Sequence, residues 1–218
     1  MDADEIVGGW QRRLVAMAES PGYAFRDTPR HRIEQHHRRL TVFVGYPEAE
    51  VAAAEAGLGV RFPAVFRAYL LAMAKSPGEL FRGSDRAGVA EFPQFRAEAL
   101  ELLAETDADL SLPPEAVVLL THQGYTFVYL LAVGGFDGPM MQWTETEPEP
   151  RRVAATFAEM VDAELRMMES NDAALRAQGG YYLTLDSEGG SSQSYPALAS
   201  GERPLDIVPA RKPWWKFW

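Results

Sequence analysis

The most strongly patterned stretch of the chain spans residues 51–71 and reads VAAAEAGLGVRFPAVFRAYLL, two helical segments around a short joint. Gly57 and Gly59 suit the left-handed conformation that ends many helices, and Pro63 suits the start of the next helix. The second segment has an apolar stripe at helical spacing, formed by Phe66, Tyr69, Leu70 and Met73. Because the joint is so short, the sequence predicts two neighbouring packed helices, one over 47–57 and one from residue 63.

Three other segments show the periodicity of amphipathic helices. Residues 1–20 form the first, and Pro21-Gly22 ends it. Its apolar face consists of Ile6, Trp10, Leu14 and Met17. Residues 94–105 form the second and residues 151–169 a long third helix. The stripe of that third helix consists of Val153, Phe157, Met160, Val161, Leu165 and Met168.

Short β-type runs occupy residues 40–44, 116–121, 126–133, 139–143 and 181–185. The breaks on either side of 126–133 are short and contain glycine, as hairpin loops do, so the three middle runs predict an antiparallel meander. Helices followed by a meander and a closing helix indicate an α+β domain, with helices packed on an antiparallel sheet.

The amino-acid composition excludes some kinds of functional site and disfavours some kinds of partner. The 218 residues include no cysteine, which excludes disulfides, thiolate metal sites and cysteine nucleophiles. No apolar run reaches the length of a transmembrane helix, and the acidic N-terminus MDADEIVGGW lacks a signal-peptide layout, so a cytoplasmic location is expected. The net charge of −10 disfavours direct binding to nucleic acid or anionic lipid and favours a basic partner, although solubility alone also accounts for it.

No residue pattern predicts a catalytic, cofactor or metal site. His31, His36 and His37 lie among the arginines of segment 30–39, which points to a solvated basic segment or an internal salt-bridge site. His122 stands alone in a hairpin loop, without an identifiable acid or nucleophile partner. The serines of segment 188–194 lie in a glycine-rich stretch that has the composition of a flexible loop or linker.

Two features are candidate partner-binding sites. One is a negative face contributed by the loop residues Glu145, Glu147 and Glu149 together with the helix residues Glu48, Glu50 and Glu55. A merely solvated surface is the alternative. The other is the aromatic and basic tail RKPWWKFW over 211–218, with Trp214, Trp215 and Trp218. This tail suits a groove on its own domain, a partner or self-association contact, or a membrane interface.

Several segments, taken in order, resemble the SUKH superfamily, the Smi/Knr-type domain. The opening signature is matched by Tyr46-Pro47, Val51, Glu55, the run Leu58–Pro63, Phe66, Tyr69 and Leu70. Later parts are matched by Phe127–Val133, Asp137–Met140 with Trp143, and Thr156–Met160. The resemblance covers roughly residues 42–168. It divides the chain into a helical extension over 1–41, a SUKH-like domain over 42–170 and a C-terminal extension over 171–218.

The resemblance implies a non-catalytic protein-binding domain without cofactors. In bacteria the superfamily is similar to immunity proteins that neutralise toxins, often nucleases. By this resemblance, the chain would bind a basic toxin domain in a stoichiometric complex and occlude it. A regulatory or scaffold module that uses its aromatic tail is the alternative, since the flanks exceed those of a minimal inhibitor. An unrecognised hydrolase is the third reading, with no nucleophile motif to support it.

Overall fold

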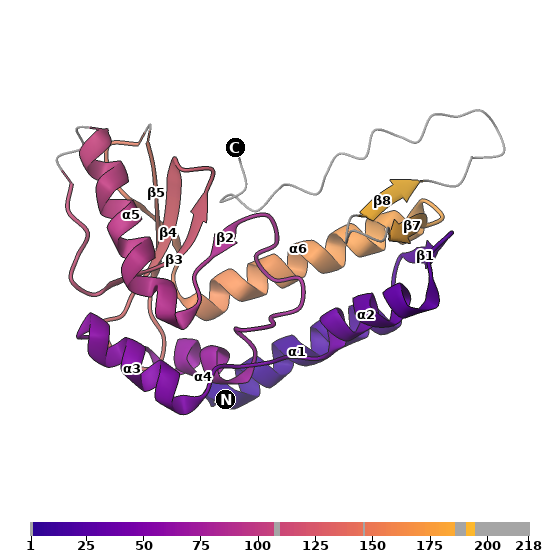
Figure 1. The fold of residues 1–218 in the computed structure, drawn as a ribbon, viewed down its shortest axis with the longest axis horizontal. Coiled ribbons are helices and arrows are strands. Elements are labelled where there is room, and N and C mark those ends of the chain that lie inside the picture. The colour runs from indigo at the N-terminus through magenta and orange to yellow at the C-terminus, as the bar shows by residue number, and fades with distance from the viewer. Residues whose placement is uncertain (1, 107–109, 146, 186–190, 195–218) are drawn as a thin grey trace.

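The computed structural model describes residues 2–106, 110–145, 147–185 and 191–194 and has the predicted α+β fold (Figure 1). The helices are α1 (Ala3–Glu19), α2 (Arg30–Thr41), α3 (Glu48–Leu58), α4 (Ala64–Ala72), α5 (Phe92–Glu105) and α6 (Phe157–Ala177), with a 3-10 turn, η1 (Val89–Glu91). The strands are β1 (Tyr23–Phe25), β2 (Asp85–Arg86), β3 (Ala116–His122), β4 (Thr126–Leu131), β5 (Met140–Thr144), β6 (Arg151–Ala154), β7 (Tyr181–Leu185) and β8 (Ser191–Ser194).

The main sheet has the order β2-β3-β4-β5-β6, with every neighbouring pair antiparallel, so the predicted meander is confirmed. Alternate residues of β4 point to opposite faces. Phe127 and Tyr129 face the cluster under α5, whereas Val128 and Leu130 face the larger core under α1, α4 and α6. The sheet is therefore the middle layer of three (Figure 1).

The predicted start of the last helix near residue 151 is wrong, because residues 151–154 form β6 and pair with β5. Helix α6 begins at Phe157, where the Thr156 hydroxyl accepts a hydrogen bond from the Glu159 amide at 3.0 Å. Both oxygens of Asp137 also accept amide hydrogen bonds from the first turn, from Phe157 at 3.1 Å and Ala158 at 3.0 Å. These caps explain why the helix cannot extend back into the sheet edge.

The helix–joint–helix prediction is confirmed, except that α3 continues to Leu58, so Gly57 lies inside the helix and is not left-handed. Gly59 ends α3 in the left-handed conformation with φ 68°, and the Val60 amide donates back to the Glu55 carbonyl at 3.1 Å. The Glu55 side chain accepts the Phe62 amide at 2.8 Å and thereby bridges the joint. This contact gives the signature glutamate a structural role.

Residues 40–44 do not form the predicted strand. Helix α2 continues to Thr41, and the Val42 amide donates to the Arg38 carbonyl at 2.9 Å. Val44 makes only isolated bridges, to Ala74 and Ser76, so the β-branched run has no strand to pair with in the described residues. Val42 and Val44 remain exposed.

Helix α1 is confirmed and packs on α4 and α6. Its buried face consists of Val7, Trp10, Leu14 and Ala18, whereas Ile6 and Met17 are half-buried. The Trp10 ring meets the edge of Phe157 with centroids 6.0 Å apart, and its indole N–H donates to Asp162 at 3.2 Å. The three-part division of the chain stays a prediction, and its second boundary, residue 170, lies inside α6.

A second sheet with the order β1-β7-β8 lies at the far end of α6 from the main sheet (Figure 1). The strand predicted over 181–185 is confirmed as β7, which pairs parallel to β1 and antiparallel to β8. Residues 191–194 are therefore a strand and not part of a flexible linker. Strand β1 has three residues, too few for an alternation pattern to be visible in the sequence.

Candidate functional site

The predicted glutamates form two groups, one on α3 and one in the loop between β5 and β6. Helix α5 lies between the two groups. Glu48, Glu50 and Glu55 lie on α3, which packs on α5. The loop with Glu145, Glu147 and Glu149 lies between β5 and β6. Trp143, which packs with Ala99 and Leu103 of α5, donates its indole N–H to the Glu147 carbonyl at 3.0 Å. The loop is thus held beside the second half of α5 (Figure 1).

Helix α5 carries acidic residues that the motif-based reading missed. Glu98, Glu101 and Glu105 are exposed and follow helical spacing, so they share one side of the helix. The only basic residue of α5, Arg96, turns inward and donates to the carbonyls of Pro113 at 3.0 Å and Ala116 at 2.8 Å. Assigning the charges of the predicted helix 94–105 to its faces would have revealed this stripe. We call α3, the outer side of α5 and loop 145–149 the acidic face.

The predicted residues of the acidic face differ in how free they are. Glu48 and Glu55 both form ion pairs with Arg67, and hydrogen bonding to Glu48 raises the pKa of that arginine. Glu147 pairs with Arg151 at 3.0 Å. Among the described residues, Glu50, Glu145 and Glu149 are exposed and belong to none of the ion pairs. The free negative charge of this face therefore lies mostly on residues other than Glu48 and Glu55.

An exposed apolar tip lies at the joint between α3 and α4. In the β4–β5 connection, the side chains of Val133 and Phe136 are 66% and 51% exposed. The Ala64 and Val65 amides of α4 donate to the Gly135 and Phe136 carbonyls at 3.1 Å and 3.0 Å, so the tip is fixed on the helix joint. Fixed apolar side chains beside charged ones are typical of the centre and rim of protein–protein interfaces.

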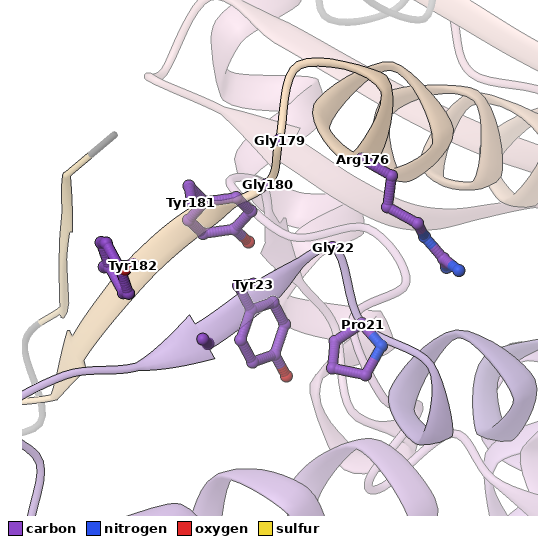
Figure 2. A pocket seen from close by; sticks show the side chains of 9 residues that line it. Pro21, Gly22, Tyr23, Arg176, Gly179, Gly180, Tyr181 and Tyr182 are labelled. Atoms are coloured by element: carbon purple, nitrogen blue, oxygen red, sulfur yellow. The ribbon is translucent and has the colours of Figure 1, made fainter. Parts of the chain in front are cut away.

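Three hollows of the described structure lie around the small sheet instead. Tyr23 lines three neighbouring hollows of about 410, 390 and 440 Å³. Figure 2 shows Tyr23 and Tyr181 on the adjacent strands β1 and β7, with Arg176 of α6 nearby. The two tyrosine rings have centroids 5.5 Å apart.

His36 holds α2 against this sheet. Its Nε2 lies 2.8 Å from the Tyr23 hydroxyl and its Nδ1 lies 3.1 Å from Nη2 of Arg39. A guanidinium has only donors, so Nδ1 accepts, and Nε2 carries the proton and donates to Tyr23. The ring is therefore neutral. Burial and then Arg39 lower the pKa of His36, and burial raises the pKa of Tyr23 to about 12.

This arrangement makes stability depend on pH. The pKa of His36 lies below its ordinary value of 6.5 in the folded chain. At pH values between the folded and the unfolded pKa, the unfolded chain therefore binds more protons than the folded chain. We expect the free energy of unfolding to fall as pH drops below about 6.5, and to fall less in His36→Gln, which keeps one donor and one acceptor. Urea unfolding between pH 5 and 8 measures this. His31→Gln, at an exposed histidine, should match the unsubstituted chain, and identical profiles for all three proteins would refute the assignment.

The other site residues considered in the sequence do not come together in a site within the described part of the chain. His122 lies 3.2 Å from the Gly83 carbonyl, through Nδ1. In the described part of the chain, no three histidine, aspartate or glutamate side chains are placed to hold a metal ion. Trp214, Trp215 and Trp218 lie outside the described residues. Among the helices described, none is long and apolar enough to cross a membrane.

The fold and its surfaces define an α+β domain with an acidic face, a fixed apolar tip and helical additions at both ends. Residues 45–163, more than half of the chain, match the model of the SMI1 / KNR4 family (SUKH-1), and the chain belongs to this family. No curated protein matches the chain. The match begins before α3 and ends within α6, so α1, α2 and the small sheet lie outside it.

The family-matched residues also hold the charge of the chain. Residues 45–163 contain 18 of the 31 acidic residues and 8 of the 21 basic ones. This difference equals the net charge of −10, so the two flanks together are neutral.

Proposed function

We propose that this protein is a non-catalytic immunity-type protein that neutralises a basic bacterial toxin domain by covering its substrate-binding surface. The observation that carries the proposal is the concentration of negative charge in the family-matched residues, with part of it on the outer side of α5. A nuclease, for example, presents arginines and lysines to phosphate. Carboxylates on an inhibitor speed the encounter with such a surface and occupy the same basic groups.

The acidic face supplies orientation, and the apolar tip supplies the buried centre of the contact. Exposed pairs of opposite charge contribute little each, typically below about 1 kcal/mol, so charge alone does not make a tight complex. Val133 and Phe136 can bury apolar area without rearrangement, because α4 holds their backbone.

A pull-down from the native cells tests the proposal, with the tagged full chain and washes at low and then high salt. We expect one basic partner, retained near one to one and loosened by salt. Glu98→Gln, Glu101→Gln and Glu105→Gln combined should weaken capture. The matched control removes three exposed charges elsewhere, as Asp4→Asn, Glu19→Gln and Asp27→Asn, and should capture normally.

Capture must be followed by inhibition. The captured protein should be toxic when expressed alone, and an equimolar amount of the chain should suppress its activity. If the partner stays fully active at a molar excess of the chain, the immunity function is refuted. Several partners, held equally well by the acidic-face variant, would favour a scaffold.

A further inference from the structure

The groove between α2, α6 and β7 has a volume of about 390 Å³ and an apolar floor. Met167 and Leu175 of α6 form part of this floor, with Leu183 of β7 opposite. Most of its walls lie outside the family-matched residues. It is therefore a feature that this chain adds to the family domain.

The mouth of the groove carries two guanidinium groups that a single carboxylate holds in place. Glu79 pairs with Arg39 at 3.0 Å and with Arg82 at 2.8 Å. The two arginine side chains are still 49% and 65% exposed, so their planar faces remain available. Guanidinium planes stack on aromatic rings, and methionine sulfur makes favourable contacts with ring edges. The chemistry of the groove thus suits aromatic side chains.

We propose that residues 211–218 of the same chain, RKPWWKFW, bind in this groove. This segment places Trp214, Trp215, Phe217 and Trp218 within five positions. The described chain last passes the groove at β8, because Ser191 lines the groove and β8 ends at Ser194. The sixteen residues 195–210 reach up to about 50 Å, which is ample.

Tethering favours this occupant. A segment joined to its site by a short linker binds at an effective concentration in the millimolar range, so moderate intrinsic affinity suffices. The proposal does not depend on the immunity function, since the groove and the acidic face are different surfaces.

Tryptophan fluorescence of the full chain tests the proposal directly. Of the five tryptophans, Trp10 and Trp143 are buried in the core at 2% and 0% exposure, and the other three lie in the tail. A variant with Trp214, Trp215 and Trp218 all changed to Phe gives the signal of the two core residues. Subtracting it isolates the tail, whose emission and acrylamide quenching can then be compared between variants.

We expect the tail tryptophans to be protected from acrylamide in the unsubstituted chain and in Ala174→Glu, an exposed neighbour outside the groove. Leu175→Glu places the same charge in the floor and should shift tail emission to the red and increase quenching. Met167→Lys is a second groove variant of opposite charge, and circular dichroism checks that each variant folds.

Three results would overturn the proposal. Tail tryptophans quenched in the unsubstituted chain as strongly as in urea would show that the groove does not hold them. Protection that disappears on dilution would assign the contact to a second copy. Protection that appears only with anionic phospholipid vesicles would assign the tail to a membrane surface.

Discussion

Replacing Gly45 by alanine is expected to lower the free energy of unfolding by at least about 3 kcal/mol. The added Cβ would collide with backbone atoms, which cannot move aside as the end of a flexible side chain could. A Cβ at this position would lie 1.7 Å from the Leu71 carbonyl oxygen and 2.7 Å from the Ala72 amide nitrogen. The next residue is fixed as well, because the Tyr46 amide donates to the Leu70 carbonyl at 2.9 Å. Chemical denaturation followed by circular dichroism measures the loss.

Gly57→Ala is the matched control for this experiment. Gly57 lies in α3, and a Cβ there meets nothing within 4 Å. We expect this change to raise stability by about 0.5–1 kcal/mol, through better helix propensity. If Gly45→Ala were as stable as Gly57→Ala, the close crossing of the chain over the end of α4 would be wrong.

Replacing Trp10 by alanine is expected to cost about 3–5 kcal/mol, the usual range for removing a buried aromatic side chain. Trp10 is 2% exposed, and its ring lies against Phe157 at the start of α6. Helix α1 lies outside the family-matched residues, yet its buried face belongs to the same core as α4 and α6. Urea unfolding should show one cooperative transition at a lower midpoint.

Arg12→Ala is the control on the same helix, because Arg12 is exposed. Its effect should stay within about 0.5 kcal/mol. A separate early transition for α1, or an unchanged midpoint in Trp10→Ala, would mean that the N-terminal helix unfolds independently of the family domain.

The residues of the candidate site were partly accessible from the sequence. Glu50, Glu145 and Glu149 are exposed in the positions where charge counting placed them. Glu55, by contrast, accepts the Phe62 amide, which only the geometry of the joint reveals. Helical spacing alone would have placed the carboxylates of α5 on one side, but Arg96 leaves them free only because it turns inward to the carbonyls of Leu112, Pro113 and Ala116, which no local pattern shows.

Two segments adopt a secondary structure other than the one that their local pattern predicts. Residues 40–44 are rich in β-formers but have no strand beside them among the described residues, so the start of the run joins α2. Residues 151–154 continue a helical apolar stripe in the sequence, yet the free edge of β5 recruits them as β6. Strand formation needs a partner, and the partner is a property of the tertiary structure.

The sequence by itself determined what depends on neighbouring residues: the helices over α1 and α3–α5, the glycine joint, the meander, the family and the absence of thiol chemistry. Only the tertiary structure decided that α1 completes the core and that Tyr23, His36 and Glu79 gather around one groove. The Trp10–Asp162 hydrogen bond joins residues 152 positions apart. Periodicity and capping carry no information over that separation, because such contacts form only when distant elements pack.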